Sequence, residues 1–311
     1  PHAVYVRFSD EGIPYNPLTK SDPDVMLSAA RTGFINATTI KMPDTATSIG
    51  RGAFEGSCLK SFILPQSIKK IGAFAFANCN NLESINIPQG VTEISESTFA
   101  GCSSLLSISM PSSLQTIGAS AFAESGLTSV TIPNSVQTIG DKAFYQSNLT
   151  SVILPASLRT IGKSAFQGCR GINSVSIPGS VNAIGENAFD VFLTNLDINN
   201  PLASLAVGQN AFSFAEGAVF YCRASALPTV ESKSFANARN ATLYVPSASL
   251  ALYQSTAPWN TFKQIRNIED GPACATPEID FDYGKIVVKC ETPGAECVRI
   301  DWKVSGSQSQ R

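Results

Sequence analysis

The sequence predicts an elongated solenoid of about ten turns with 22 or 23 residues per turn, followed by a small β-rich segment. Two regular series of residues indicate this fold, because phenylalanine and proline each recur at steps of 22 or 23 residues. The phenylalanines are Phe54, Phe76, Phe99, Phe122, Phe144, Phe166, Phe189, Phe212 and Phe235, and the prolines are Pro43, Pro65, Pro88, Pro111, Pro133, Pro155 and Pro178. A fixed period of this length is typical of repeat proteins, in which each unit packs on its neighbours.

One complete turn, residues 127–148, shows what each part of the repeat predicts. Residues 129–132 (Ser-Val-Thr-Ile) alternate polar and apolar side chains, which is the pattern of a half-buried strand. Pro133 ends that strand because proline has no N–H to donate. Gly140 is expected at a bend with a positive φ. Residues 141–146 have room for one or two helical turns, with the phenylalanine facing inward.

The repeated apolar positions predict one continuous core. A single turn cannot bury its own apolar face, whereas stacked turns place strand beside strand and phenylalanine over phenylalanine. Neighbouring strands are spaced by about 4.8 Å, so about ten of them form a rod or arc. We therefore interpret the phenylalanine, isoleucine and alanine columns as core.

The repeat resembles a known family. Residues 71–91 and 117–140 carry, with variations, the pattern IGxxAFxxCxxLxSIxIPxSVxxIG, which resembles the BspA-like leucine-rich repeat. The resemblance covers about residues 34–265 and implies a leucine-rich-repeat solenoid with a strand and a short helical turn in each repeat. It also implies a closing turn in which Trp259 shields the last repeat. Members of this family are surface-exposed or secreted proteins of host-associated bacteria, and several are adhesins.

The two ends of the chain lack the repeat. We assign residues 1–33 to an N-terminal cap, with a strand at 4–8 and a helix at 24–31, because the exposed end of a solenoid needs covering. We assign residues 34–268 to the repeat domain. Since no signal peptide is visible, we expect a processed or shortened form of a longer protein. A lipid-attachment cysteine before Pro1 would make that protein a lipoprotein.

Residues 269–311 form a third unit, which is β-rich. A β-hairpin is predicted at 278–290, turning at Tyr283 and Gly284, and a third strand at 297–304. Three strands are too few for an independent core, so we interpret this unit as part of a β-sandwich module.

Composition excludes several classes of function. The chain has 24 acidic and 22 basic residues, and this net charge of −2 leaves no basic excess for nucleic acid. No apolar run approaches the roughly 20 residues of a transmembrane helix. The lone histidine, His2, lies at the second position, so catalytic triads and histidine metal sites have no interior imidazole. We predict no cofactor, no metal site and a monomer.

The eight cysteines do not follow a metal-binding pattern, because no CxxC spacing occurs. Three of them lie three residues after a repeat phenylalanine, where other turns have serine, so we interpret the slot as a small buried position. These positions are Cys79, Cys102 and Cys169, with Ser125 and Ser147 in other turns and Cys58 one residue further on. A Cys79–Cys102 disulfide is the alternative, and Cys290–Cys297 is the most plausible pair in the tail.

Two other kinds of candidate site have simpler explanations. Asp22 with Asp24, and Asp280 with Asp282, could act as carboxylate pairs, but we interpret them as solvated charges. Asn36, Asn148 and Asn240 begin glycosylation motifs, which we interpret as turn residues.

The outward face of the predicted strands is the most informative candidate site. Its side chains form two columns of small hydroxyl groups, with aromatic residues toward the C-terminus, and solenoids commonly bind partners on such a face. We expect Phe220 and Tyr244 to be large exposed aromatics there. The candidate ligand-binding residues are Ser84, Ser107, Ser109, Ser129, Thr131, Ser151, Ser174, Ser176, Phe220 and Tyr244.

Three hypotheses for function follow. The first is a non-enzymatic, adhesin-like protein of the cell surface or secreted medium that presents the strand face to a protein, a glycan or another cell. The second is a structural spacer that carries the C-terminal β module. The third is a carbohydrate-active enzyme, which would need a buried carboxylate pair in a cleft. We favour the first.

Overall fold

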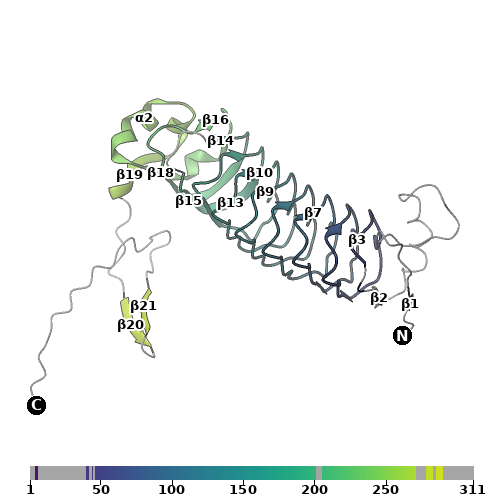
Figure 1. Ribbon diagram of the computed structural model, residues 1–311. Helices are drawn as coiled ribbons and strands as arrows, with labels where there is room; N and C mark the ends of the chain where they lie inside the picture. Colours follow the sequence, from purple (N-terminus) through teal and green to yellow (C-terminus); the bar gives the residue numbers. More distant parts are fainter. Residues whose placement is uncertain are drawn as a thin grey trace, which may run out of the picture.

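The computed structural model describes residues 44, 46–200 and 205–270, and the four strand segments 4–5, 40–41, 278–282 and 285–289. Turns of the chain follow one another along a single axis to form an elongated parallel β-solenoid (Figure 1). Nine turns carry the phenylalanines Phe54 to Phe235, and strand β19 (Gln264–Asn267) adds the strand of a further turn. The predicted solenoid with 22–23-residue turns is confirmed.

The longest ladder runs through the residue pair that precedes the repeat glycine, or its replacements Ser95 and Glu231 in the third and ninth turns. It is a seven-stranded parallel sheet, and the first two turns have strands at the same position. Its strands are β7 (Glu93–Ile94), β8 (Thr116–Ile117), β9 (Thr138–Ile139), β10 (Thr160–Ile161), β12 (Ala183–Ile184), β14 (Ala206–Val207) and β16 (Thr229–Val230), and the strands of the first turns are β3 (Ser48–Ile49) and β5 (Lys70–Ile71). Labels β7, β9, β10, β14 and β16 mark this row in Figure 1.

A second parallel sheet of six strands forms the C-terminal part of the solenoid. Its strands are β11 (Ser174–Ile177), β13 (Phe189–Ile198), β15 (Phe212–Cys222), β17 (Phe235–Ala236), β18 (Thr242–Val245) and β19. In earlier turns the same position holds only β4 (Ser61–Phe62) paired with β6 (Ser84–Ile85), and isolated bridges such as Thr131 to Ile153.

The location of the main ladder differs from the sequence prediction. Residues 129–132 were expected to form the strand of their turn, but in that turn the ladder is β9, and Thr131 makes only a bridge. Residues Val130 and Ile132 still point into the core and Thr131 still points outward. Proline follows the predicted segment in successive turns, and its missing N–H cuts the ladder short there.

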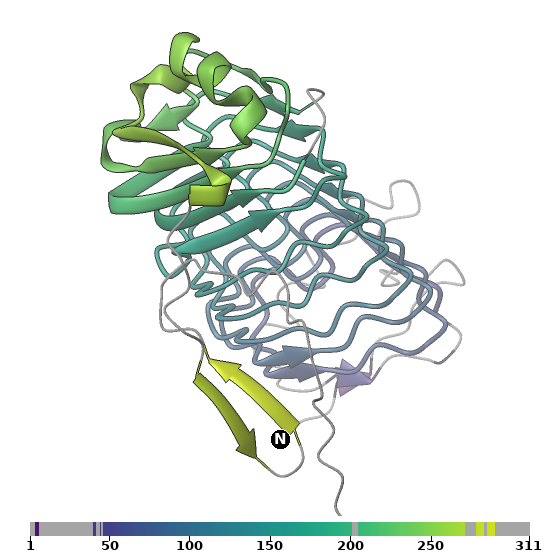
Figure 2. The same cartoon turned by 90° about the vertical axis from the view of Figure 1, so that its left-hand side faces the viewer.

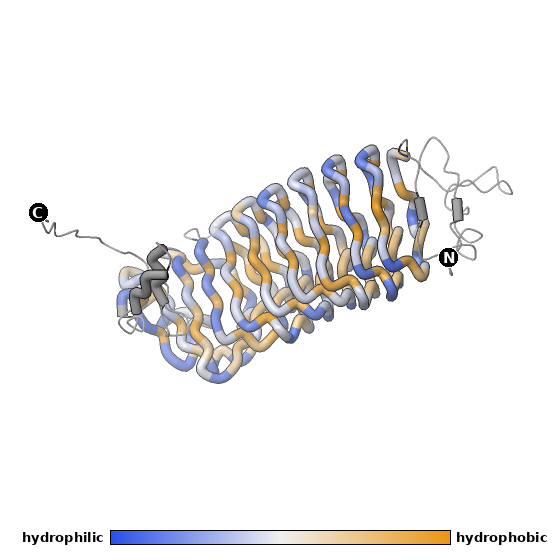
Figure 3. The backbone as a smooth tube through the Cα atoms, turned by 90° about the horizontal axis from the view of Figure 1, so that it is seen from below, coloured by the Kyte–Doolittle hydropathy of each residue, from blue (hydrophilic) through white to orange (hydrophobic). Residues whose placement is uncertain are grey.

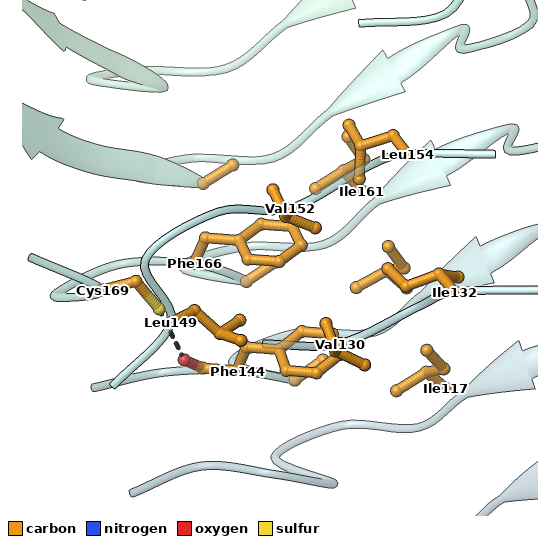
Figure 4. Close-up of a cluster of buried hydrophobic side chains, with 14 of the residues drawn as sticks. Ile117, Val130, Ile132, Phe144, Leu149, Val152, Leu154, Ile161, Phe166 and Cys169 are labelled. Atoms are coloured by element: carbon orange, nitrogen blue, oxygen red, sulfur yellow. Dashed lines mark hydrogen bonds between the residues drawn. The ribbon is translucent and has the colours of Figure 1, made fainter. Parts of the chain in front are cut away.

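The phenylalanine column is the centre of the core. Rings of successive turns lie nearly parallel, with centroids 5.3 Å apart for Phe122 and Phe144 and 5.2 Å apart for Phe144 and Phe166. Figure 4 shows Phe144 and Phe166 in this stack, and Figure 3 shows apolar segments recurring at the same place in successive turns. Both rings have no exposed surface.

The segment around each phenylalanine is a series of hydrogen-bonded turns, so the predicted helical turn at 141–146 is wrong. The N–H groups of Lys142, Phe144 and Gln146 donate to carbonyl groups of the next turn, at 2.7 to 2.8 Å. The residues between them donate within their own turn, for example Tyr145 to the carbonyl of Lys142 at 3.0 Å. In a helix, every one of these N–H groups would donate to a carbonyl of the same segment. In this structure, every second N–H group donates to the neighbouring turn.

The repeat glycine does not have the positive φ that we expected. Positive φ occurs two residues before and two residues after the phenylalanine, as at Lys142 (56°) and Gln146 (52°). Gly140 is required for close approach instead, since a Cβ there would lie 2.7 Å from the backbone nitrogen of Ala119 and 2.8 Å from the carbonyl carbon of Gly118. The same contact recurs at Gly162, Gly185 and Gly208, so glycine allows successive turns to meet.

Aromatic residues close the C-terminal end of the solenoid, as the family resemblance predicts. Trp259 is 1% exposed, and its ring centroid lies 4.9 Å from those of Phe235 and Tyr253. The covering segment contains α2 (Leu250–Ser255) and the 3-10 helices η1 (Ala238–Asn240), η2 (Ser247–Ser249), η3 (Trp259–Thr261) and η4 (Ile268–Asp270). Figure 2 shows α2 above the last turns.

Four further strands belong to the ends of the chain. β1 (Val4–Tyr5) lies within the segment that was predicted as a strand at 4–8. It pairs in parallel with β2 (Ile40–Lys41). β20 (Glu278–Asp282) pairs antiparallel with β21 (Lys285–Lys289), which confirms the predicted hairpin. The predicted helix at 24–31 and strand at 297–304 lie outside the described residues.

The glycine contact leads to a stability prediction. Gly140→Ala should lower the free energy of unfolding by about 1–3 kcal/mol, because the added methyl group must push two turns apart. Urea denaturation followed by circular dichroism measures this change.

Gly56→Asn is the matched control. Gly56 has φ of 69° and nothing within 4 Å of an added Cβ, and Asn78 already occupies the equivalent position in the next turn. This variant should change stability by less than about 0.5 kcal/mol. Equal losses in the two variants would contradict the close-approach explanation.

Candidate functional site

The strand face is the surface formed by the outward side chains of residues 61–63, 84–86, 107–109, 129–131, 151–153 and 174–176. Successive residues alternate between this surface and the core, as β11 shows with its pattern of exposed, buried, exposed and buried residues. Eight predicted site residues lie exposed on it: Ser84, Ser107, Ser109, Ser129, Thr131, Ser151, Ser174 and Ser176. The structure therefore places them on one continuous surface.

Charge is absent from the sequence of this face. Asp, Glu, Lys and Arg are all missing from six segments of eight residues, each of which begins at a serine of this face. The segments are 61–68, 84–91, 107–114, 129–136, 151–158 and 174–181. The chain as a whole is 15% charged, so chance would place several charges in these segments. Charges lie elsewhere on the turns, for example at Arg159 and Lys163, which are exposed around β10, and at Lys60 and Glu83, which border the face directly before Ser61 and Ser84.

Large apolar side chains are exposed on the same face. Ile63 is 80% exposed and Ile153 is 81% exposed, at the outward position that is serine or threonine in other turns. Leu106, directly before Ser107, is 58% exposed. Sequence reasoning missed Leu106, although the equivalent positions Lys60 and Glu83 are charged and so indicate exposure. The strand face thus combines hydroxyl groups with isolated apolar side chains.

Phe220 is not part of this face, so its expected exposure is wrong. It is completely buried, and its ring centroid lies 5.6 Å from those of Phe235 and Phe262. In the register of β13 and β15, Phe220 pairs with the inward Leu196, and the outward Asp197 pairs with Tyr221. A bulge between these strands shifts their register, so Phe220 lies beside Leu196 and not beside Asp197. A constant repeat length of 22 or 23 residues does not predict this shift.

Tyr244 points outward but is only 6% exposed, so its expected exposure is also wrong. Its ring stacks on Tyr221, with centroids 5.1 Å apart and planes at 25°. Beside them Arg223 donates two hydrogen bonds to the carboxylate of Asp197, one of 2.8 Å and one of 3.1 Å. At this end of the solenoid the two tyrosine rings stack on each other and Arg223 pairs with Asp197, so these side chains already have partners within the protein.

The cysteine slot has the predicted small buried character. The Sγ of Cys169 donates to the carbonyl oxygen of Phe144 at 3.0 Å and lies 3.3 Å from the hydroxyl of Ser147 (Figure 4). Cys79 and Cys102 donate to the phenylalanine of the preceding turn in the same way. Both are free thiols, so the alternative of a bridge between them is not borne out. Cys274, Cys290 and Cys297 lie outside the described residues.

Burial controls the ionisation of these thiols. It raises the pKa of Cys169 to about 11, while the hydrogen bond from Ser147 acts in the opposite direction. Burial likewise raises the pKa of Cys102 and Cys79. A thiol that stays protonated is a poor nucleophile and a poor metal ligand, so these cysteines serve packing.

An open groove follows the glycine column over the first three turns, with a volume of about 570 Å³. Arg51 and Lys70 line it from the first two turns, and Glu93 and Glu96 line it from the third. The guanidinium of Arg51 lies 4.6 Å from the centroid of the Phe74 ring. Opposite charges at equivalent positions of neighbouring turns attract one another across the groove, so we interpret it as a surface charge network.

The remaining candidates from the sequence occupy ordinary positions. Asn148 is exposed in a turn, and Asn240 lies half-buried in η1. Asp280 and Asp282 lie in β20, while Asn36, Asp22 and Asp24 lie outside the described residues. Within residues 46–200 and 205–269, no group of three His, Cys, Asp or Glu side chains is arranged to hold a metal ion.

The family is decided by a match to its sequence model. The model of the BspA type leucine rich repeat region matches residues 32–147 and 137–257, in six copies. The chain belongs to the BspA-type leucine-rich repeat family. The resemblance seen in the sequence over about residues 34–265 is confirmed, with the model match ending at residue 257.

Solved structures that are similar to this chain include other bacterial proteins. A leucine-rich repeat protein from Bacteroides ovatus is 26% identical, with a TM-score of 0.54 over 76% of this chain and 70% of that one. A leucine-rich cell surface protein from Faecalibacterium prausnitzii is 18% identical, with a TM-score of 0.40 over 75% of this chain and 88% of that one. A search of curated proteins gave no match.

Among the described residues, each helix falls short of the length and apolar character that a bilayer span requires.

The thiol pKa leads to a prediction for pH dependence. Folding raises the pKa of Cys169 from 9.0 to about 11, so its contribution to stability is complete below pH 9 and is lost as the pH rises to 11. Over this range the wild-type protein should lose about 2 kcal/mol more than Cys169→Ser, because serine does not titrate there. Urea denaturation at pH 8, 9, 10 and 11 gives the comparison.

Serine already occupies this slot at Ser147, so Cys169→Ser should fold. The titrations of lysine and tyrosine are common to both proteins and cancel. Identical pH profiles would show that burial of the thiol does not control its ionisation.

Proposed function

We propose that this protein is a non-enzymatic recognition protein of the bacterial cell surface or secreted medium, and that it binds a protein or glycan ligand on the strand face. Its role is adhesin-like attachment in a host-associated bacterium. Membership of the BspA-type family supports this proposal, since the resemblance implies surface or secreted proteins.

The exposed, uncharged strand face is the observation that carries the proposal. Surfaces of soluble proteins normally carry charge for solubility, so an extended exposed face without charge is a candidate interaction site. Here Ile63 and Ile153 are exposed within six segments that contain no charged residue, and Leu106 is exposed directly before one of these segments. The rigid turn-to-turn hydrogen bonds hold this surface in place, so little conformational entropy is lost on binding.

A structural spacer is the second candidate. The uniform serine column favours it, because small hydroxyl groups also suit closely stacked turns without any ligand. A spacer has no specialised surface, whereas the exposed isoleucines and the segregation of charge are features that spacing does not need.

Substitution on the strand face tests the proposed function. The triple variant Ser107→Arg, Ser129→Arg, Thr131→Arg places three charges on exposed positions without touching the core. On arrays of host matrix proteins and glycans it should lose at least about tenfold in affinity for any ligand that the wild-type protein binds.

Gln137→Arg is the control. Gln137 is exposed beside β9, on a different side of the turn, and this variant should bind as the wild type does. Equal binding by all three proteins would exclude the strand face as the site. A wild-type protein that binds nothing on either array would instead favour the spacer.

A further inference from the structure

We infer that the junction between the second and third turns of the solenoid is a hinge, at which the side that carries the main ladder opens while the phenylalanine side holds the turns together. The second turn contains Gly72 and Phe76, and the third contains Ser95 and Phe99. The inference goes beyond the proposed function and is independent of any ligand, because it depends on the contacts between turns.

The main ladder is interrupted at this junction. β3 pairs with β5, and the seven-stranded sheet begins at β7, so β5 and β7 do not pair. At neighbouring junctions the ladder side is bonded, since Gly118 donates its N–H to Ile94 at 2.7 Å and Gln115 donates to Thr92 at 2.8 Å. Within residues 46–200, the N–H groups of Ser95 and Thr92 make no equivalent bond to the second turn.

Ser95 explains the interruption. It replaces the glycine that other turns use for close approach, and a Cβ at the equivalent Gly118 would lie 2.7 Å from the carbonyl oxygen of Ile94. The Cβ of Ser95 therefore keeps the two backbones from pairing on this side. Its hydroxyl donates to the carbonyl oxygen of Ile71 at 2.8 Å, so one side-chain bond stands in place of the backbone bonds.

A second departure from the repeat removes another contact beside the ladder. In several turns the serine that lies two residues after the proline donates its hydroxyl to the preceding turn, as Ser113 does to the carbonyl oxygen of Val91 at 2.7 Å. Ser67 and Ser157 make the same bond. Gly90 occupies this position in the third turn and has no hydroxyl to donate. Both departures therefore weaken the same side of the same junction.

The ninth turn shows that loss of the glycine alone does not interrupt the ladder. It has Glu231 at the glycine position, yet β14 and β16 pair, and Glu231 donates its N–H to Val207 at 3.3 Å. The hydroxyl of Ser234 reinforces this contact, because it accepts from the N–H of Glu231 and donates to the carbonyl oxygen of Val207. In the third turn the equivalent Thr98 donates to Ser95 within its own turn, so this reinforcement is missing.

The phenylalanine side of the junction is intact. The N–H groups of Phe74, Phe76 and Asn78 donate to carbonyl groups of the third turn at 2.7 to 2.9 Å. The rings of Phe76 and Phe99 stack with their centroids 5.5 Å apart. A junction that is bonded on one side and open on the other can tilt about the bonded side, which is how a hinge works.

The open groove lies over this junction and leaves space for the movement. Its volume is about 570 Å³, and Lys70 lines it from the second turn while Glu93 and Glu96 line it from the third. Among the described residues, no ion pair joins Lys70 to either glutamate, so no salt bridge holds the groove in one position.

Distances between two spin labels test the hinge in the full chain. The labels are carried by noncanonical amino acids, because the eight cysteines would compete for thiol labels. One pair replaces Lys70 and Ala183, and the matched pair replaces Glu93 and Ala206. The two pairs span the same number of turns, and the first crosses the junction whereas the second does not. Double electron–electron resonance should give a distance distribution at least about twofold wider for the first pair.

Restoring the repeat residues should close the hinge. Gly90→Ser combined with Ser95→Gly allows the missing bonds to form, and the flexible side chain of Lys69, which lies against Gly90, can turn away to admit the serine. The distribution of the first pair should then narrow to within about 1.5-fold of the matched pair. Glu231→Gly is the control, because the ladder is already intact there, and it should leave the first pair unchanged. Circular dichroism confirms that each variant is folded.

Three outcomes would overturn the inference. The first is equal widths for the two label pairs in the otherwise unaltered protein, which needs no restored variant. The second is a longer mean distance for the first pair without a wider distribution, because the junction would then be a fixed gap. The third is a folded restored variant whose distribution stays wide, because Gly90 and Ser95 would then not be the cause of the movement.

Discussion

Stacking of successive turns is the constraint on which the rest of this structure depends. Each turn has an apolar interior that it cannot cover alone, and the column of phenylalanine rings provides the continuous contact between turns. The other repeated features serve this contact. Glycine lets the backbones approach at positions such as Gly140, and backbone N–H groups near Phe144 donate to the next turn. Serine or cysteine fills the small space beside each of the first six rings, from Phe54 to Phe166.

The same constraint produces the surface. Because alternate residues of each segment point into the core, those between them must point outward at a constant spacing. The outward positions of successive turns therefore line up as columns along the rod. Serine and threonine columns give a neutral face, while Arg159 and Lys163 show that other sides of the turns carry charge. Selection on one repeat unit can thus specify a whole face.

Period and alternation were sufficient to predict the solenoid, the core columns and the exposure of residues such as Ser129 and Thr131. They were insufficient where the backbone departs from the period. The bulge between β13 and β15 moved Phe220 into the core, and a stack with Tyr221 covers Tyr244. Glycine alone does not reveal whether φ or close approach requires it, so the role of Gly140 was misassigned. Residues 141–146 suggested a helix because local patterns do not show hydrogen bonds to a neighbouring turn.

The unfolding free energy of Phe144→Ala, compared with that of Tyr145→Ala, tests the role of stacking most directly. Phe144 is fully buried between the rings of Phe122 and Phe166, whereas the adjacent Tyr145 is half-buried and lies outside the stack. Loss of the stacked ring should cost about 3–5 kcal/mol in urea denaturation, and loss of Tyr145 should cost about 1 kcal/mol. Similar losses for the two variants would contradict the view that the phenylalanine column holds the solenoid together.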